Sequence, residues 1–497
     1  MSTKSSDRTS SPPLLDKPKL QGLHTTASRI KHSGQVFTPN YLVNLILDEA
    51  QYCGPGILQR HCMENSCGDG AFLVEIVRRY VHEHRQAHGS DEGLTEDLSR
   101  YIHGIELDST AYECCIANLN DLSSELGIGE ITWDIHNSNA LTTTLFDNSM
   151  DCVIGNPPYV RVHNLDNSYS EVKKYSFASG GMTDLFLVFF ELGFRMLKTG
   201  GRLCYITPSS WLNSVAGSKL RDYIRHNRCW LSAIDLGHFQ PFKATTYTLI
   251  SLFEKGVRND HVKYHSFSPS MLCKRFVAAL PLADIDTGGY FYLSTPSTLK
   301  TLKSILNSST PKYVTAKNGF ATLSDKVFIR AEFPFSRYLI PTIKASTGKW
   351  YKAFFPYDSN GVPIPKDKVF TDPGIREYLY SQRENLLKGG NENTNSNWHL
   401  YGRTQALKDV FREKLAVNTT IKNVQSIKVN LVPRGCGIYS GLYILSDFDF
   451  GLIRAIICTE DFISFVSSLK KYKSGGYYTF NSRDLELYVN YSLDELN

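Results

Sequence analysis

The sequence predicts an α/β protein in which a mostly parallel sheet is flanked by helices and followed by a second, mixed α+β domain. From Gln35 to about Lys255, segments of strand character alternate with segments of helical character. This alternation is typical of a parallel sheet with helices on both faces. After that stretch the alternation ends, and the chain becomes rich in Tyr, Phe, Asn, Ser and Lys. We therefore expect a flexible basic arm over residues 1–33, an α/β domain over 34–260 and a mixed domain over 261–497.

The first elements follow the strand–helix plan. The segment NYLVNLILDEAQ, residues 40–51, carries apolar residues at helical spacing and begins directly after Pro39, so we expect a helix there. The segment HCMENSCGDGAFLVEIVRRYVHE reads as a short strand, a glycine-containing loop and a helix that begins near Ala71. The segment YIHGIELDSTAYECCIANL repeats this plan, with a strand that ends at Leu107.

The later elements of the α/β region continue the pattern. A third strand and its loop are expected in EITWDIHNSNAL, and a fourth strand in MDCVIGNPPY. The segment DLFLVFFELGFRMLKTGG is apolar on nearly all sides, which predicts a buried helix that is stopped by Gly200 and Gly201. A strand from Arg202 to Thr207 follows.

Composition excludes several classes of protein. No apolar run approaches the ~20 residues of a membrane span, and the first residues lack the apolar core of a secretory signal. The eleven cysteines include no C-x-x-C pair, which argues against a zinc site and a disulfide framework. The histidines of HEHRQAH lack further ligands nearby, so we expect no metal. A reducing cytoplasm fits this cysteine usage best.

The net charge of +5 is unevenly distributed. Residues 1–260 hold 24 Lys and Arg against 29 Asp and Glu, a charge of −5. Residues 261–497 hold 30 against 20, a charge of +10. A basic half joined to an acidic half points to contact with a polyanion, although an evenly solvated surface is an alternative that charge counts leave open.

Three loops carry residue types that suit one ligand. In ENSCGDG, Gly68 and Gly70 allow close approach of the backbone, while Glu64 adds a carboxylate without the basic residue of a phosphate loop. A carboxylate without a basic partner favours a cationic or zwitterionic ligand. Glu106 can accept hydrogen bonds from ribose hydroxyls, and Asn139 can pair with an adenine edge. Singly, each residue also suits an ordinary loop, helix cap or turn; together they describe a site for an adenosine that carries an amino acid.

The order and spacing of six segments resemble a known family. GQVFTP, ENSCGDGAFL, GIELD, NSNAL, GNPPYVR and PFKATTYTLI, within residues 34–255, are similar to the gamma-class N6-adenine DNA methyltransferases of bacterial type II restriction–modification systems. NGFATLSDKVFI and YGRTQAL look like segments of that family's target-recognition domain. The resemblance implies a Rossmann-like methyltransferase domain with a mostly parallel seven-stranded sheet.

The same resemblance implies an activity and its partners. S-adenosyl-L-methionine would be the cofactor, and double-stranded DNA with a short specific site would be the substrate. The methyl group would go to N6 of a flipped-out adenine and protect host DNA. A cognate restriction endonuclease would act on the same site without needing to bind this chain, which we expect to be a monomer.

The resemblance also assigns residues to the cofactor. They come from the segments around GQVFTP and from the loops after the first four strands: Thr38, Pro39, Glu64, Asn65, Cys67, Gly68, Gly70, Phe72, Glu106, Leu107, Asn139, Ala140 and Asn156. One of them departs from the family pattern, because Asn139 stands where an Asp usually accepts from the adenine amine of the cofactor. An amide oxygen still accepts that bond, without charge assistance.

The segment NPPY supplies the expected catalytic residues. In the family pattern, the Asn156 side-chain oxygen and the Pro157 carbonyl accept the two N–H bonds of the target amine, and Pro158 keeps the turn rigid. Tyr159 stacks on the flipped base, which helps to offset the cost of unpairing it. Phe242 is the expected second aromatic, with Phe239 as the alternative.

Four side chains are expected to contact DNA. Arg161 lies two residues after NPPY, in the segment GNPPYVR. Arg403 and Gln405 of YGRTQAL can reach guanine and adenine edges, respectively. Lys326 suits either a phosphate or a base.

Three other functions remain possible from sequence. NPPY also occurs in enzymes that methylate a glutamine amide in release factors and in RNA guanine methyltransferases, although the long basic C-terminal region fits those enzymes less well. A restriction enzyme fused to its methyltransferase would need a nuclease motif, and we find no convincing one. A DNA-binding regulator without catalysis is disfavoured by the intact NPPY.

Overall fold

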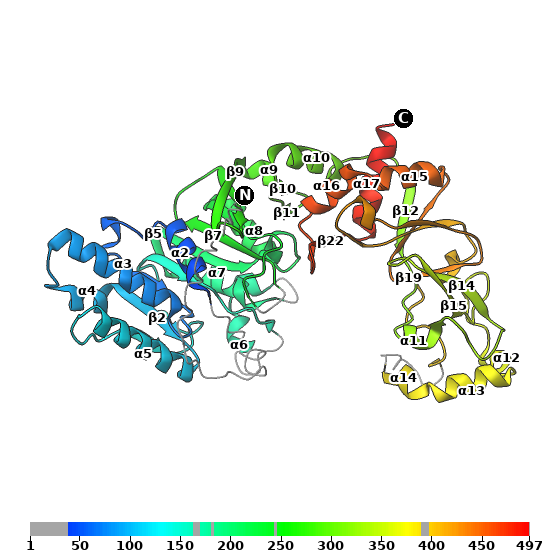
Figure 1. Cartoon of the computed structure of the whole chain (residues 1–497), viewed down its shortest axis with the longest axis horizontal. Coiled ribbons are helices and arrows are strands. Elements are labelled where there is room, and N and C mark those ends of the chain that lie inside the picture. The colour runs from blue at the N-terminus through cyan, green and yellow to red at the C-terminus, as the bar shows by residue number, and fades with distance from the viewer. Residues whose placement is uncertain (1–37, 163–168, 180–182, 243–245, 389–396, 497) are drawn as a thin grey trace, which may run out of the picture.

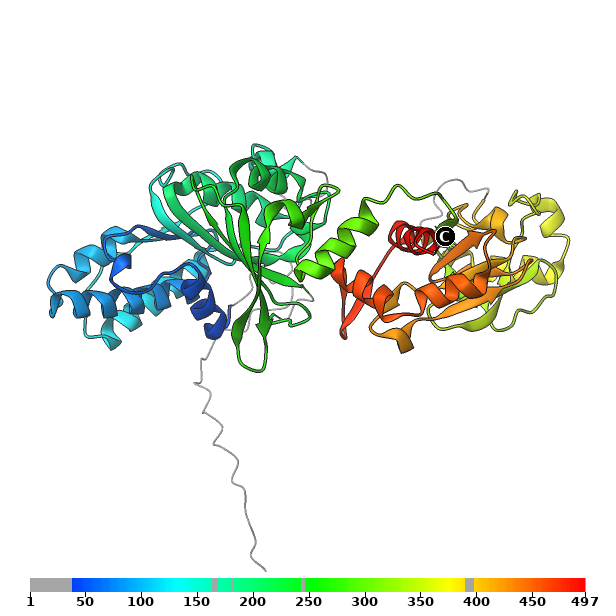
Figure 2. The ribbon, with the colours of Figure 1, turned by 90° about the horizontal axis from the view of Figure 1, so that it is seen from above.

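The computed structural model describes residues 38–162, 169–179, 183–242, 246–388 and 397–496. The expected N-terminal arm, residues 1–33, lies outside the described residues. We define a first lobe, residues 40–291, and a second lobe, residues 296–494. Figures 1 and 2 show the two lobes side by side along the long axis of the molecule, joined at one end.

The first lobe is built on one nine-stranded sheet. Its strands are, in chain order, β1 (Cys62–Glu64), β2 (Ile102–Glu106), β3 (Asp134–Asn137), β4 (Met150–Gly155), β5 (Leu197–Pro208), β6 (Trp230–Asp235), β7 (Thr248–Glu254), β8 (His261–Ser268) and β9 (Cys273–Pro281). They lie in the order β3-β2-β1-β4-β5-β7-β6-β8-β9. Neighbours from β3 to β5 are parallel, whereas β7 is antiparallel to both β5 and β6. The predicted Rossmann-like α/β fold is confirmed.

The sheet is larger than the seven strands that the resemblance implies, because it continues past residue 260. β8 pairs in parallel with β6, and β9 pairs antiparallel with β8. The domain boundary expected at residue 260 therefore falls inside the sheet, which ends at Pro281. A hairpin has no strand–helix alternation, so nothing in the sequence pattern links these two strands to the parallel region.

Helices cover both faces of the sheet. The helices of the first lobe are α2 (Asn40–Glu49), α3 (Ala71–His88), α4 (Leu94–Tyr101), α5 (Ser109–Glu125), α6 (Tyr169–Val172), α7 (Leu185–Met196), α8 (Ser218–Asn227) and α9 (Leu282–Ile285), with 3₁₀ turns η1 (Pro55–Ile57), η3 (Ser176–Ala178) and η4 (Ser209–Leu212). The buried side chains of α2, α3 and α5 belong to one hydrophobic cluster, and those of α7 and α8 belong to another.

Helix α7 ends earlier than the sequence indicates. Gly200 and Gly201 are the expected stop, yet the backbone becomes extended at Leu197, the residue after the helix. Leu197 pairs with Met150 of β4, and β5 begins there. Gly200 instead lies within this long strand, with a φ of 81° that suits glycine, and its N–H donates to the Lys255 carbonyl.

The second lobe contains two four-stranded sheets, one three-stranded sheet and several helices, as expected for a mixed α+β region. Its helices are α10 (Pro296–Leu306), α11 (Asp325–Phe328), α12 (Lys366–Val369), α13 (Pro373–Ser381), α14 (Arg383–Lys388), α15 (Phe450–Ile457), α16 (Glu460–Ser468) and α17 (Ser482–Asp494), with η5 (Leu407–Asp409) and η6 (Val424–Ser426). The strands are β12 (Val314–Asn318), β13 (Ile329–Arg330), β14 (Leu339–Lys344), β15 (Lys349–Phe354), β16 (Lys414–Val417), β17 (Thr420–Ile421), β18 (Val429–Val432), β19 (Gly437–Tyr439), β20 (Leu442–Ser446), β21 (Tyr472–Lys473) and β22 (Tyr477–Thr479). A short pair, β10 (Asp286–Thr287) and β11 (Tyr290–Phe291), precedes this lobe.

The two lobes share one hydrophobic core. A single cluster of buried side chains includes Phe190 and Trp211 of the first lobe together with Leu299 of α10 and Phe462 of α16. The large aromatic residues in this cluster bury much apolar surface each. The lobes are therefore joined by packed side chains as well as by the chain itself.

Three further findings concern membrane, metal and redox chemistry. Among the described residues, no helix has the length and apolar character needed to cross a membrane. The same residues contain no group of three or more His, Cys, Asp or Glu side chains arranged to hold a metal ion. All eleven cysteines are free thiols.

Candidate functional site

Four loops meet at one edge of the sheet. The adjacent strands β3, β2, β1 and β4 are parallel, so the loops that follow them lie side by side at their carboxyl ends. In folds of this kind, ligands bind at that edge. The two central loops are close together: a Cβ placed on Gly155, at the end of β4, would lie 3.5 Å from Cγ of Glu64, at the end of β1.

The loop after β1 is held in a tight turn by its glycines and by Glu106. Gly68 and Gly70 have φ values of 55° and 86°, which glycine adopts readily. The Gly68 N–H donates to Glu106 Oε2 at 2.8 Å, and the Asp108 N–H donates to Glu106 Oε1 at 2.8 Å. Glu106 thus fixes two loops at once. Each carboxylate oxygen keeps acceptor capacity for a ligand hydroxyl.

Glu64 is the strongest pointer to the charge of the ligand. The residue is 3% exposed, and its Oε2 atom has no hydrogen-bond partner in the described part of the chain. Burial, and next the neighbouring Cys115, Asp69 and Glu106, raise the pKa of Glu64 well above its ordinary value of 4.5. A buried carboxyl group in acidic surroundings would repel a phosphate and would gain most from a cation. The carboxyl end of β1 therefore suits a ligand with an ammonium group.

The loop after β3 brings Asn139 to the same edge. Its Oδ1 accepts the Leu141 N–H at 3.0 Å, and the Ser138 N–H donates to the Glu106 carbonyl at 3.0 Å. Ala140 is buried, whereas Leu107 is 64% exposed at the end of β2. Leu107 is thus free to cover a flat ligand, while Asn139 has one acceptor lone pair already engaged.

Three of the residues that the resemblance assigns to the cofactor have their side chains in the protein core. The Asn65 amide exchanges hydrogen bonds with the Tyr205 hydroxyl at 2.7 and 3.0 Å, and Asn65 is 1% exposed. Phe72 and Cys67 are buried in the cluster under α3. Their side chains support the loop, and only the backbone of this stretch can reach a ligand. Sequence reasoning missed Ser66, two residues after Glu64, whose buried hydroxyl oxygen has no hydrogen-bond partner among the residues that the structure describes.

The loop after β4 presents the Asn156 amide in a fixed orientation. Asn156 Nδ2 donates to Thr38 Oγ1 at 3.1 Å. In this arrangement the amide nitrogen faces Thr38 and the oxygen points away from it. Pro157 is buried and Pro158 is half-buried. Pro39 supplies the first backbone acceptor of α2, for the Leu42 N–H, so the start of α2 holds Thr38 in place.

Tyr159 and Phe242 lie next to one another. Their ring centroids are 6.2 Å apart, with the planes at 75°. The Tyr159 hydroxyl donates to the Ile206 carbonyl at 3.1 Å, which anchors the ring to β5. Phe239 packs instead on Phe267, at 5.1 Å between centroids. Of the two aromatics that the sequence leaves open, Phe242 is thus the one beside Tyr159.

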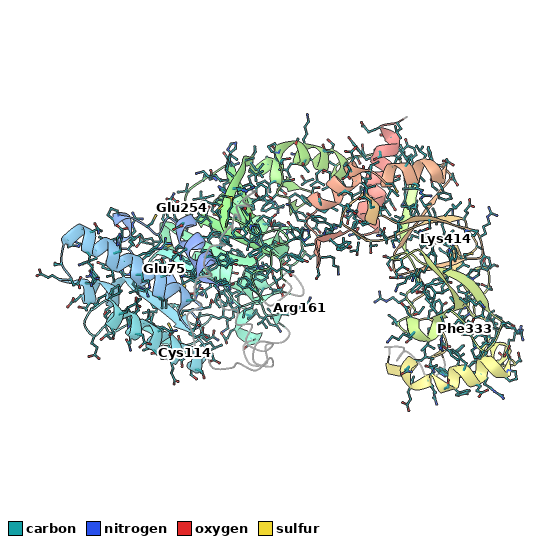
Figure 3. All side chains as sticks on the ribbon, viewed as in Figure 1. Glu75, Cys114, Arg161, Glu254, Phe333 and Lys414 are labelled. Atoms are coloured by element: carbon teal, nitrogen blue, oxygen red, sulfur yellow. The ribbon has the colours of Figure 1, made fainter. Side chains whose placement is uncertain are left out.

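The residues expected to contact DNA lie on both lobes. Arg161 is exposed, and Figure 3 shows it on the side of the first lobe that is turned toward the second lobe. Lys326 of α11 and Arg403 are also exposed. Figure 1 shows α11 on the side of the second lobe nearest the first. Gln405 differs, because its Nε2 donates to the Gly319 carbonyl at 2.6 Å. That bond uses one of the two N–H donors of the amide and leaves the other available, so Gln405 supports the fold whether or not it reaches a base.

Comparison with known families agrees with this geometry. The profile of the Eco57I restriction-modification methylase family matches residues 89–242. The matched stretch includes β2, the loop after β3, the NPPY loop and the segment that ends at Phe242.

Curated relatives are similar over less than half of the chain. The type II methyltransferase M.BstVI from Geobacillus stearothermophilus is 29% identical over 230 residues, which cover 44% of this chain and 41% of that protein. M.XhoI from Xanthomonas vasicola is 29% identical over 236 residues, covering 45% and 42%. The restriction enzyme and methyltransferase RM.Eco57I from Escherichia coli is 26% identical over 278 residues, covering 44% and 28%. The aligned part of the chain thus spans less than half the length of each relative.

Solved structures extend the likeness in fold to both lobes. The restriction-modification enzyme MmeI, solved in complex with DNA, has a TM-score of 0.67 over 92% of this chain and 68% of its own, at 13% identity. The DrdV–DNA complex has a TM-score of 0.53 over 89% of this chain and 53% of its own, at 10% identity. At such identities the likeness concerns the fold alone.

Proposed function

We propose, from the match of residues 89–242 to the Eco57I restriction–modification methylase family, that the chain is a site-specific DNA methyltransferase. In this proposal it transfers a methyl group from S-adenosyl-L-methionine to N6 of an adenine that has left the duplex. The observation that carries the proposal is the contact between the two loops at the sheet edge. The acidic pocket under Glu64 adjoins Gly155, and the next residue, Asn156, is fixed by Thr38.

The pocket fits the cofactor by the chemistry of its side chains. Glu64 suits the ammonium group of the amino-acid part, Glu106 suits the ribose hydroxyls, and Asn139 suits the adenine amine. When bound, S-adenosylmethionine supplies the methyl group. Within the described residues of this pocket, Glu64 Oε2 and the Ser66 hydroxyl are buried polar atoms without a partner, and a ligand with donors and acceptors would satisfy both.

The NPPY loop makes the target amine reactive. The lone pair of an adenine amine is delocalised into the ring, which makes the nitrogen a poor nucleophile. The Asn156 oxygen and the Pro157 carbonyl accept the two N–H bonds and draw that lone pair out of conjugation. The amine becomes acidic once it is methylated, so its proton can leave without a strong base. This is electrostatic stabilisation by acceptors fixed in advance.

The aromatic pair binds the extruded base. Tyr159 and Phe242 pack edge to face at 6.2 Å, so a base can enter between them only if one ring turns or moves aside. Stacking on an aromatic ring is worth roughly 1–3 kcal/mol per base, which is of the same order as the cost of unpairing. The two rings therefore contribute to base extrusion as well as to base binding.

The second lobe is the proposed target-recognition element. The residues after 260 carry a charge of +10, and Lys326 and Arg403 are exposed on them. The structures of MmeI and DrdV both contain DNA, which supports duplex DNA as the partner here. Monomeric action, a bacterial cytoplasmic location and a partner endonuclease that acts on the same short site belong to the same proposal.

Cofactor affinity should depend on pH through Glu64. Because the pKa of Glu64 in the free protein is raised, the carboxyl is neutral at acidic pH and must lose a proton to pair with an ammonium group. Affinity for S-adenosylmethionine should therefore increase with pH below the raised pKa, by up to about tenfold per pH unit, and level off above it. Calorimetric titration should show this slope for the wild type and a flat profile for Glu64→Gln. A steep slope that persists in Glu64→Gln would assign the proton to another group.

Asn139→Asp should tighten cofactor binding or leave it unchanged. A carboxylate can keep the bond from the Leu141 N–H and offer its second oxygen with full charge, a gain of about 1 kcal/mol at most. Asn120→Asp is the matched control, because it adds the same charge on exposed α5 and keeps the acceptor for Trp133. Equilibrium dialysis with labelled cofactor measures both. Clear weakening by Asn139→Asp alone would show that this loop does not hold the adenine.

Lys326 and Arg403 should affect DNA binding in different ways. Lys326→Ala should weaken binding to all sequences alike and flatten the salt dependence by about 0.9 on a log–log plot, as expected for one phosphate contact. Arg403→Ala should relax discrimination at one base pair, costing ~1–3 kcal/mol on the preferred site only. Fluorescence anisotropy at several salt concentrations separates the two. Identical uniform effects for both variants would make Arg403 a phosphate contact.

Labelled cofactor and unmethylated plasmid DNA test the activity itself. Purified full-length protein should transfer the label to DNA, and nucleoside analysis should find it on N6-methyldeoxyadenosine. Label in RNA or in protein, with none in DNA, would support one of the alternative NPPY enzymes.

A further inference from the structure

The second lobe returns to the first at the carboxyl end of β6. Asp235, the last residue of β6, is 8% exposed. Its Oδ2 lies 3.2 Å from Lys470 Nζ and accepts the Tyr472 hydroxyl at 3.0 Å. Its Oδ1 accepts the Gly237 N–H at 2.8 Å, at the start of the loop that leads to Phe242. One carboxylate therefore joins that loop to the second lobe, and Figure 1 shows β22 reaching toward the first lobe here.

Aromatic rings of the second lobe pack against the same loop. The His238 ring lies 4.9 Å from Tyr472 and 4.7 Å from Tyr478, edge to face with both. Tyr247, on the other side of Phe242 in the chain, lies 4.9 Å from Tyr472. The hairpin β21–β22 thus contacts residues that precede and follow Phe242.

Lys470 is held at this contact by its charged and aromatic partners and by its backbone conformation. Burial alone would lower its pKa, yet the adjacent Asp235 carboxylate and the tyrosines raise it well above the ordinary value, so the Lys470 side chain is charged. Lys470 also has a φ of 55°, a left-handed conformation that is unfavourable for a residue with a side chain. The carbonyl of the preceding residue, Leu469, accepts from Asn213 of the first lobe at 3.0 Å.

A contribution to fold stability does not by itself explain the buried Asp235–Lys470 pair. A buried ion pair seldom stabilises a protein more than apolar residues of similar size would, because both charges must leave water. A buried pair does define the local geometry. Each charge must stay beside its partner, because separating the two would leave an unpaired charge in the interior. The position beside the Phe242 loop makes that geometry relevant to the target base.

We propose that Asp235, His238, Lys470, Tyr472 and Tyr478 form a clasp, through which the second lobe positions Phe242 for the extruded base. These are positioning residues, because they act through the loop and touch neither base nor cofactor. The inference rests on the proposed function and adds to it a physical link between target recognition and base binding. Seating of the second lobe on DNA and closure of the base pocket are then coupled events.

Three clasp variants and one matched control test this link. Lys470→Met and Asp235→Asn each leave one partner alone, and the double variant removes both charges. Lys471→Met is the control, because Lys471 pairs with Asp484 within the second lobe at 2.6 Å. Hydrogen–deuterium exchange of the free full-length protein should be faster in peptides covering residues 236–242 for both single variants, by about tenfold, which corresponds to roughly 1.4 kcal/mol of local opening. It should be unchanged for the control, and the double variant should recover in part.

Kinetics give the second readout. The single variants should lower kcat for methyl transfer to plasmid DNA by about tenfold while the cofactor Kd stays within about twofold, because the effect is on base positioning. Unchanged exchange, or faster exchange with unchanged kcat, would overturn the proposal. If the charge variants fail to fold, Tyr472→Phe keeps the ring, removes only the hydroxyl bond, and should show the same two changes at smaller size; no change in either would overturn it.

The exchange measurement uses neither DNA nor cofactor. It therefore reports on the clasp even if the wild-type chain transfers no methyl group to DNA. Absence of methyl transfer would refute the proposed function. The link between Lys470 and the loop would still be tested by the exchange data alone.

Discussion

Replacing Asn156 by Ala should reduce methyl transfer by about 10²–10³-fold, the size seen when a fixed electrostatic contact to a reacting group is lost. The cofactor pocket should remain, because Glu64 and Glu106 are held by other strands and loops. Single-turnover transfer to DNA, measured with saturating cofactor, isolates the chemical step. Cofactor binding by calorimetry should stay within about twofold of wild type, since the lost contact belongs to the target amine.

Asn156→Asp is the informative companion variant. It keeps an oxygen for the amine but loses the N–H that Asn156 donates to Thr38, so its rate should fall between the wild type and Asn156→Ala. A rate for Asn156→Ala close to wild type would show that this loop has another purpose. Equal losses in rate and in cofactor binding would place Asn156 in the pocket rather than at the amine.

Tyr159→Ala should lower kcat/KM for DNA by about tenfold to 100-fold, because one stacking surface worth roughly 1–3 kcal/mol is removed. Tyr159→Phe and Tyr159→Trp should recover most of the loss. Phe lacks only the hydroxyl that bonds to the Ile206 carbonyl, so a small remaining deficit measures that anchor. Steady-state kinetics with plasmid DNA is the measurement.

The neighbouring phenylalanines provide the control for this stacking argument. Phe242→Ala should resemble Tyr159→Ala, because the two rings are neighbours at 6.2 Å. Phe239→Ala should affect stability more than catalysis, since Phe239 packs on Phe267. A larger loss of kcat/KM for Phe239→Ala than for Phe242→Ala would reverse the assignment of the second aromatic.

Periodicity predicts the parallel part of the fold well. A buried parallel strand followed by an amphipathic helix leaves a distinctive pattern, and the loops at the strand ends then fall on one edge by topology alone. That is why the sequence alone suffices to place Glu64, Glu106, Asn139 and Asn156 together. The hairpin β8–β9 lacks such a pattern, so the sequence does not reveal that the sheet extends to Pro281.

Sequence patterns do not predict which side chains form hydrogen bonds with residues far away in the chain. Asn65 bonds to Tyr205, 140 residues away, and is therefore buried in the core. Gln405 donates to Gly319, 86 residues away. Such long-range pairs depend on how the elements pack, which local spacing does not encode. The contact between Tyr472 and Asp235 spans 237 residues, and that between Asn213 and the Leu469 carbonyl spans 256.

Modification-sensitive sequencing of DNA tests the central claim most directly. DNA would come from a methylation-deficient bacterial strain that expresses the full chain, with Asn156→Ala expressed at the same level as the control. The account predicts N6-methyladenine at one position of a single short sequence with the wild type, and none with Asn156→Ala. Absence of modified adenine with well-expressed wild-type protein, modification of another base, or equal modification by Asn156→Ala would contradict it.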